Sequence, residues 1–167
     1  KNQGLSPKEI YKFVSDRIYG QERAVKAATM LLYNHIHAHK RNILFAGPTG
    51  CGKTEIWRVM SRLYPNIRII DSTMLTMQGW SGSFKVRDIF SSMSQEEAEK
   101  AIIVFDEFDK FCEPLYGSNG TNYGAAAQNE LLKLIEGGQI DFPADKGKPA
   151  LELDSSGISF VFCGSFE

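Results

Sequence analysis

Blocks of apolar residues at two different spacings alternate along this chain. Near the N-terminus, Ser6 and Pro7 supply a helix N-cap and a proline at the first helical position, and Glu9 is placed to complete a capping box. Apolar residues then recur at helical spacing as far as residue 18, and a second helical stripe occupies residues 21–40. The pattern therefore predicts two helices before the first strand.

Four later segments have the features of short strands, three of them almost wholly apolar. These strands are predicted at residues 43–46, 66–71, 101–105 and 158–163. Helical patterns separate them, at residues 54–63, 84–93 and 125–136. Residues 139–157 are rich in turns and predict a hairpin. Alternating strands and helices predict an α/β fold, with a parallel sheet covered by helices on both faces.

The composition is that of an ordinary globular domain. The 167 residues are 43% hydrophobic and 23% charged, which is enough for one substantial core. The 19 basic residues nearly balance the 20 acidic ones, so no global field attracts nucleic acid or an anionic membrane. No apolar run approaches the roughly 18 residues of a membrane helix. The three cysteines, Cys51, Cys112 and Cys163, are too scattered for a disulfide framework or a zinc-ligand pair, which favours a reducing compartment.

Residues 47–54 carry a complete phosphate-loop pattern between a predicted strand and a predicted helix. The sequence is Gly47-Pro48-Thr49-Gly50-Cys51-Gly52-Lys53-Thr54. In such a loop the backbone N–H groups face the phosphates of ATP, the lysine reaches the terminal phosphates and the threonine hydroxyl ligates Mg²⁺. The alternative is a glycine-rich turn that binds nothing, but such a turn does not require lysine and then threonine at the helix start.

A second chemical motif follows the apolar strand at residues 101–105. Asp106 and Glu107 stand at the carboxyl end of this strand, where open parallel sheets bind their ligands. We interpret Asp106 as part of the Mg²⁺ shell and Glu107 as the catalytic residue that orients or deprotonates the attacking water, together with Lys53. The alternative is a solvated strand end. Asp109 and Lys110 are interpreted as structural or supporting groups.

These motifs resemble the large nucleotide-binding subdomain of ClpX-type AAA+ unfoldases. The resemblance extends from about residue 18 to residue 166 and includes Leu131-Leu132-Lys133-Leu134-Ile135-Glu136-Gly137. It implies a P-loop fold and ATP hydrolysis with ATP and Mg²⁺ as cofactors. It also implies that Ile18 and Tyr19 contact the adenine, that Glu55 belongs to the nucleotide site, and that Ser165 is the first sensor residue. We therefore predict one subdomain over residues 1–167, with a helical lead-in at 1–20 and the P-loop core at 21–167.

The same resemblance implies a loop that grips polypeptide. Gly79-Trp80-Ser81-Gly82 matches the first pore loop of the family, in which an aromatic residue presses on any side chain of a translocating substrate. The alternative is that Trp80 packs into the core. Trp57 is assigned to core packing, and residues 116–123 are either a second pore loop or a disordered segment.

Unfolding and translocation of a polypeptide by a hexameric ring is the function that the resemblance implies, with a ClpP-like peptidase as a possible partner. The compartment would be the bacterial cytoplasm or an organelle matrix. Rival interpretations are an AAA+ motor or loader on nucleic acid and a nucleotide-switched scaffold. A small-molecule kinase is disfavoured because Glu107 indicates water as the acceptor.

Some features depart from the family or stay open. Residues 141–148 lack its compact basic triplet, although Lys146 and Lys148 remain. The arginine finger and second sensor of the family would fall beyond the last residue of this sequence, so we expect the chain to be weak or inactive in ATP hydrolysis by itself. His35 and His39 could form a zinc pair on one helix face but have no further ligands nearby. Cys51 is either an oxidation-sensitive thiol or a small residue at a variable position.

Overall fold

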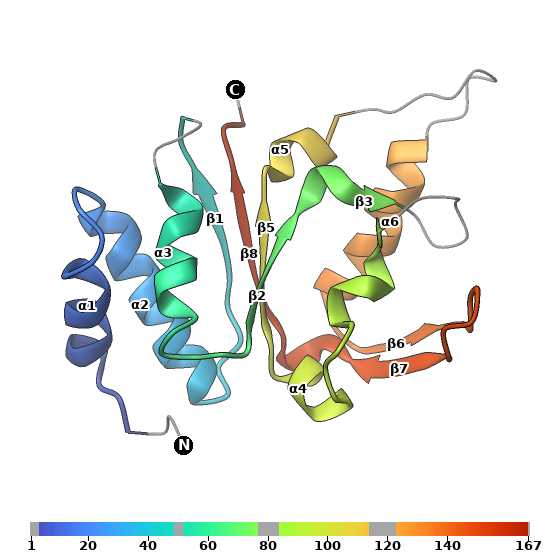
Figure 1. Cartoon of the computed structure of the whole chain (residues 1–167), viewed down its shortest axis with the longest axis horizontal. Helices are drawn as coiled ribbons and strands as arrows, with labels where there is room; N and C mark the ends of the chain where they lie inside the picture. Colours follow the sequence, from blue (N-terminus) through green and yellow to red (C-terminus); the bar gives the residue numbers. More distant parts are fainter. Residues whose placement is uncertain (1–3, 49–51, 77–83, 114–122, 167) are drawn as a thin grey trace.

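The computed structural model describes residues 4–48, 52–76, 84–113 and 123–166. At its centre is a four-stranded sheet with the strand order β1-β8-β5-β2. The strands are β1 (Asn42–Ala46), β2 (Ile67–Asp71), β5 (Ile102–Asp106) and β8 (Ser159–Gly164), and all neighbours are parallel. Their carboxyl ends therefore lie at one edge of the sheet (Figure 1), where Asp71 is paired with Asp106 and Ala46 with Gly164.

One face of the sheet is covered by three helices, α1 (Pro7–Ser15), α2 (Glu22–Ile36) and α3 (Lys53–Met60). Helix α1 begins with the predicted capping box, because Ser6 Oγ accepts from Glu9 N at 3.2 Å and Glu9 Oε2 accepts from Ser6 N at 2.7 Å. Helix α2 ends at Ile36, four residues before the predicted end. The helices pack on Ile102 and Val104 of β5, and Trp57 of α3 is fully buried there, as predicted.

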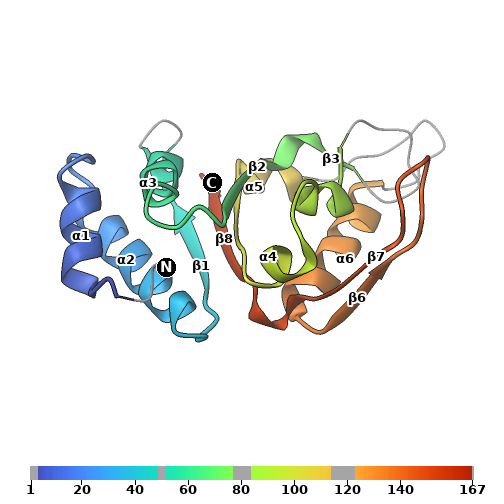
Figure 2. The same cartoon turned by 60° about the horizontal axis from the view of Figure 1, so that its bottom comes forward.

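The other face carries α6 (Tyr123–Glu136), the short helix α4 (Gln95–Glu99) and the antiparallel hairpin of β6 (Gln139–Phe142) and β7 (Leu151–Asp154). Figure 2 shows these elements on the opposite side of the sheet from α1–α3. Ile103 and Phe105 face them, whereas Ile102 and Val104 face the helices of the first layer. This alternation explains why the strand at 101–105 is apolar at every position.

The prediction of an α-helix at residues 84–93 is wrong. Phe84–Lys85 forms the strand β4, which pairs in parallel with β3 (Leu75–Thr76), and Val86–Phe90 forms the 3-10 helix η2. All five residues of η2 are buried, so this segment has no solvent-facing side of the kind that an amphipathic helix presents. The remaining elements are the 3-10 helices η1 (Ser72–Met74) and η3 (Ser155–Gly157) and the single-turn helix α5 (Phe108–Phe111).

Charged side chains are buried where η2 meets the turn at residues 143–149. Lys85, Arg87 and Asp88 are only 5%, 6% and 8% exposed. Lys85 pairs with Asp145, Asp88 Oδ1 lies 2.5 Å from Lys148 Nζ, and the Arg87 guanidinium donates to the backbone oxygens of two prolines. Because charged groups are rarely buried unless they are paired, these contacts fix the turn against η2.

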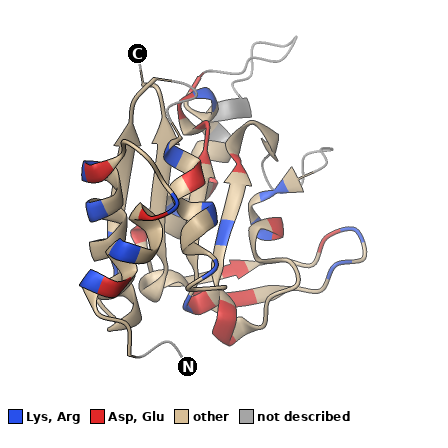
Figure 3. Ribbon diagram, turned by 60° about the vertical axis from the view of Figure 1, so that its left-hand side comes forward, with Lys and Arg blue, Asp and Glu red and all other residues tan. Residues whose placement is uncertain are grey.

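Over α1–α3, basic and acidic residues are interspersed, whereas acidic residues gather on α4 and the β6–β7 hairpin (Figure 3). The acidic group consists of Glu96, Glu97, Glu99, Asp141, Glu152 and Asp154. Among the described residues, no helix is both long enough and apolar enough to cross a membrane.

Candidate functional site

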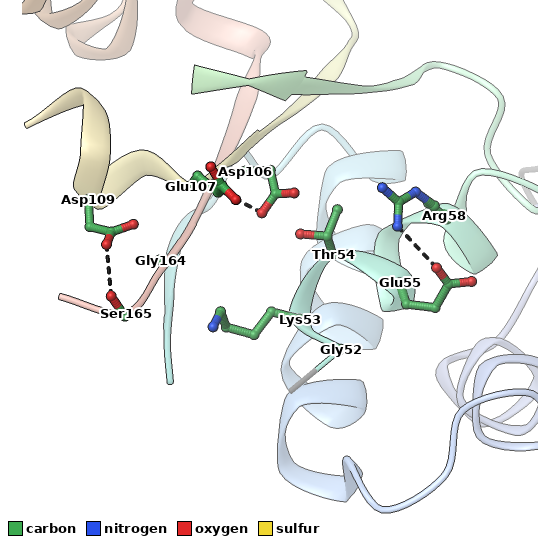
Figure 4. Close-up of a pocket in the computed structure, with 10 residues that line it drawn as sticks. All are labelled: Gly52, Lys53, Thr54, Glu55, Arg58, Asp106, Glu107, Asp109, Gly164 and Ser165. Carbon is green, nitrogen blue, oxygen red and sulfur yellow. Dashed lines mark hydrogen bonds and ion pairs between the residues drawn. The ribbon is translucent and has the colours of Figure 1, made fainter. Parts of the chain in front are cut away.

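A cavity of about 330 Å³ opens at the carboxyl edge of the sheet (Figure 4). Three segments build it: the start of α3, the end of β5 with the beginning of α5, and the end of β8. Its lining residues are Gly52, Lys53, Thr54, Glu55, Arg58, Asp106, Glu107, Asp109, Gly164 and Ser165. The position agrees with the rule that open parallel sheets bind ligands beyond their carboxyl ends.

The wall formed by α3 is suited to phosphate. Gly52 precedes the helix with φ 84°, in the left-handed region that favours glycine, and α3 begins directly at Lys53. Lys53 Nζ donates to the backbone oxygens of Gly47 at 2.6 Å and Pro48 at 2.9 Å, so the ammonium group lies over the start of the loop. A helix N-terminus next to a lysine is a favourable environment for an anion.

The wall formed by β5 carries the two acidic residues. Asp106 Oδ1 accepts from the backbone N–H of Glu107 at 2.9 Å, which fixes the Asp106 carboxylate. Glu107 has φ 51° and ψ 39°, a left-handed conformation that costs a non-glycine residue roughly 1–2 kcal/mol. Its side chain is exposed at the cavity. Backbone strain of this kind concentrates at functional sites, where the surrounding structure holds it in place.

A hydrogen bond joins α5 to the end of β8. Ser165 Oγ donates to Asp109 Oδ2 at 2.8 Å, and this bond is the main reason why the pKa of Asp109 is lowered from its ordinary value. Asp109 is therefore ionised at neutral pH. Gly164 makes the approach possible, because a Cβ atom there would lie 2.7 Å from Asp109 Oδ1 and 3.0 Å from the Asp109 backbone nitrogen.

The donor set fits a magnesium ion that is shared with phosphate. Thr54, which is 8% exposed, and Asp106 line the same cavity. Mg²⁺ in nucleotide sites takes one or two protein ligands and completes its shell with phosphate oxygens and water. Within the described part of the chain, no three His, Cys, Asp or Glu side chains form a metal cluster.

Among the predicted site residues that the structure describes, seven line the cavity: Gly52, Lys53, Thr54, Glu55, Asp106, Glu107 and Ser165. Gly47 and Pro48 are not part of this lining, but their backbone oxygens accept from Lys53 Nζ. Ile18 and Tyr19 do not. Ile18 packs, partly buried, on the core beneath α1–α3, and Tyr19 is 100% exposed. The predictions for Thr49, Gly50 and Cys51, and for the loop Gly79-Trp80-Ser81-Gly82, lie outside the described residues.

Sequence reasoning missed Arg58 and Gly164 and gave Asp109 only a supporting role. Arg58 could have been found, because it follows Thr54 by four residues and so lies on the same helix face. Its Nη1 atom is 3.1 Å from Glu55 Oε2, and both side chains are more than half exposed. The pairing of Asp109 with Ser165 had no local signal, since 56 positions separate the two residues.

The fold and the cavity together define a P-loop ATPase of the AAA type. In agreement, the family "ATPase family associated with various cellular activities (AAA)" matches residues 43–162, well over half of the chain. The chain belongs to this family, whose name describes an ATP-hydrolysing enzyme, and the sequence-based prediction of fold and enzyme class is confirmed.

Two relatives make the likeness more specific. The chain is 29% identical, over an alignment of 187 positions, to the "ATP-dependent Clp protease ATP-binding subunit ClpX" from two strains of Porphyromonas gingivalis. The alignment covers 96% of this chain and 45% of each relative, so the chain spans less than half of their length.

Proposed function

We propose that this chain binds ATP with Mg²⁺ in the cavity at the end of the sheet and hydrolyses it to unfold and translocate polypeptides, as part of a ClpX-like hexameric ring. The observation that carries the ATPase part is that Lys53 and Thr54 share one cavity with Asp106 and Glu107. Groups that attract phosphate and groups that activate water are thus combined around one space.

Each residue has a separate task in this proposal. Lys53 exchanges its contacts with the loop carbonyls for the terminal phosphates, and the N–H groups at the start of α3 bind the phosphate oxygens. Thr54 and Asp106 hold Mg²⁺, which neutralises phosphate charge when it is bound. Glu107 accepts a proton from the water that attacks the γ-phosphate.

Similarity to ClpX favours polypeptide as the polymer that is moved, with Trp80 as the gripping residue. The chief rival is a motor or loader acting on nucleic acid. Such a protein binds its polymer through clustered Lys and Arg, whereas helix α4 and the strands β6 and β7 of this chain carry acidic residues and no basic ones. A second rival, a nucleotide-switched scaffold, would use the same cavity without moving a polymer.

The proposal also includes a partner and a compartment. The partner is a ClpP-like peptidase, and the compartment is the bacterial cytoplasm or an organelle matrix. The relatives are described as a subunit of a Clp protease, which supports a peptidase as partner. Co-purification with tagged peptidase, with and without ATP, tests this part separately from the ATPase reaction.

The central test is the steady-state ATPase activity of the assembled protein, with and without an unstructured polypeptide, compared with Glu107→Gln, Trp80→Ala and Trp80→Phe. We expect polypeptide to stimulate the wild type and Trp80→Phe but not Trp80→Ala. Glu107→Gln should bind ATP with little turnover. Stimulation by DNA or RNA instead would support the nucleic-acid motor, and loss of polypeptide stimulation in Trp80→Phe as well would argue against simple aromatic gripping.

A further inference from the structure

We propose that Asp109 is a positioning residue for ATP hydrolysis, and that it acts by accepting the hydroxyl proton of Ser165. The Ser165 oxygen then presents only lone pairs to the cavity and accepts a hydrogen bond from the attacking water. This inference rests on the proposed ATPase function of the same cavity.

The direction of the hydrogen bond decides what Ser165 can do. A serine hydroxyl has one proton to donate and two lone pairs, whereas an ionised carboxylate only accepts. Ser165 Oγ lies 2.8 Å from Asp109 Oδ2, so its single proton is committed to the carboxylate. While this bond persists, Ser165 cannot donate to a phosphate oxygen. It can only accept a hydrogen bond from a donor in the cavity.

Electrostatics favour water as that donor. The terminal phosphate of ATP is negatively charged, and the Asp109 carboxylate lines the same cavity, so direct contact between the phosphate and the Asp109–Ser165 pair is unfavourable. Glu107 also lines the cavity as an acceptor. A water molecule that donates one proton to Glu107 and the other to Ser165 keeps a lone pair for attack on phosphorus.

The step is balanced with the groups present. The water oxygen forms a bond to the γ-phosphorus, and the bond from phosphorus to the bridging oxygen breaks, so that ADP leaves with the electron pair. Glu107 takes the transferred proton, while the proton between Ser165 and Asp109 stays in place. Asp109 therefore never touches the reacting atoms. It holds the Ser165 hydroxyl so that the Ser165 oxygen accepts a hydrogen bond from the water and does not donate one.

The surrounding backbone holds this pair rigidly. Gly164 has no Cβ, so α5 packs directly on the end of β8, with Asp109 close to the Gly164 backbone. The oxygen of Gly164 accepts from the backbone nitrogen of Gly47 at 3.2 Å, which connects this strand end to the start of the phosphate loop. The position of the Ser165 oxygen is thus fixed relative to both sides of the cavity.

The test compares Asp109→Asn, Ser165→Ala and Ser165→Thr in the assembled protein. In Asp109→Asn the neutral amide can donate an N–H to Ser165 Oγ as well as accept from it, so Ser165 is no longer held as an acceptor alone, with almost no change in shape. We expect kcat to fall roughly 10- to 100-fold, because the attacking water loses its orientation. The KM and the dissociation constant of a fluorescent ATP analogue should change less than about threefold. Ser165→Thr should restore most of kcat and Ser165→Ala should not.

Combining Ser165→Ala with Asp109→Asn should lower kcat no further than either change alone, because the two residues act as one unit. Asp154→Asn is the matched control. Asp154 Oδ1 accepts from Ser156 Oγ at 2.7 Å, the same kind of pair outside the cavity, and kcat should be unchanged.

An unchanged kcat in Asp109→Asn, or a loss of nucleotide affinity in place of kcat, would overturn the proposal. If Asp109→Asn does not fold, the Ser165→Ala and Ser165→Thr comparison still decides, since equal kcat values for the two would also overturn it. Failure of the proposed function gives a different result, because the wild type would then turn over no ATP and Glu107→Gln would not differ from it.

Discussion

His35 Nε2 lies 2.7 Å from the backbone oxygen of Lys100, so this nitrogen carries the proton and donates it. The other ring nitrogen, Nδ1, lies 2.7 Å from Ser159 Oγ and accepts its hydroxyl proton. Ser159 Oγ in turn accepts from the backbone nitrogen of Arg41 at 3.1 Å. One buried imidazole thus joins α2 to Lys100, just before β5, and to Ser159, the first residue of β8, at the amino edge of the sheet. Both of its nitrogens have protein partners.

This environment predicts that folding stability falls in mild acid. Burial lowers the pKa of His35, which must stay neutral to accept from Ser159. Above the ordinary histidine value of about 6.5, both the folded and unfolded chains are neutral at this position. As the pH falls below that value, the unfolded chain takes up the proton first, so the free energy of unfolding decreases. Urea unfolding between pH 8 and pH 5 measures this slope.

The matched comparison is His35→Gln beside His39→Gln. At pH 8, His35→Gln should lower the free energy of unfolding by about 1–3 kcal/mol, because buried hydrogen-bonding groups lose well-placed partners. It should also reduce the slope between pH 7 and pH 5. His39 is exposed, and its replacement should leave both quantities unchanged. An unchanged slope in His35→Gln would show that other groups cause the acid sensitivity.

The His35 contacts illustrate what the sequence could and could not predict. The phosphate loop and the Asp106-Glu107 pair are predictable because each motif is contiguous and stands next to a strand with a clear apolar pattern. His35 and Ser159 are 124 positions apart, and only the packing of α2 on the sheet brings them together. The same kind of separation hides the pairing of Asp109 with Ser165.

The error at residues 84–93 has a different cause. The pattern suggests a helical period because the apolar residues Val86, Ile89, Phe90 and Met93 recur there at spacings of three and four. The structure instead buries Lys85, Arg87 and Asp88 against a turn about 60 positions later. Lys85 and Asp88 form ion pairs there and Arg87 donates to backbone oxygens, so these polar side chains do not mark a solvent-facing side. Periodicity alone cannot distinguish these two situations.

We expect Arg87→Met to destabilise the fold by on the order of 3 kcal/mol. The Arg87 guanidinium donates to Pro143 O at 2.8 Å and to Pro149 O, and methionine keeps the apolar stem but leaves both oxygens without these donors. Lys146→Met, in the same turn but exposed, should cost less than about 0.5 kcal/mol. Chemical denaturation gives both values. Similar values for the two variants would mean that Arg87 does not hold the turn.

Gly164→Ala should impair hydrolysis and stability together. The added methyl group would lie 2.7 Å from Asp109 Oδ1 and 3.0 Å from the Asp109 backbone, so α5 must move away from β8. Such overpacking costs about 1–3 kcal/mol. Gly4→Ala is the control, because a methyl group added at Gly4 would have no neighbouring atom within 4 Å. Thermal unfolding and ATPase rates of the two variants test this, and wild-type values for Gly164→Ala would contradict it.

Trp57 should tolerate phenylalanine far better than alanine. Its ring is fully buried beside Phe45, with the ring centroids 5.9 Å apart, and its Nε1–H has no hydrogen-bond partner within the part of the chain that the structure describes. Trp57→Phe loses volume but removes an unsatisfied donor, and these effects oppose each other. Trp57→Ala loses the whole ring and should cost about 3–5 kcal/mol.

Trp57→Ala should also affect the nucleotide site, because Trp57 lies on α3, which carries Lys53 and Thr54 at its start. Because Trp57 anchors this helix to the sheet, Trp57→Ala should weaken binding of a fluorescent ATP analogue as well as stability, whereas Trp57→Phe should keep both near wild type. Measuring unfolding and nucleotide affinity on each variant separates the two effects. If Trp57→Ala unfolds more easily but binds nucleotide normally, the start of α3 is held by the loop and the sheet edge, and the packing beneath the helix does not position Lys53.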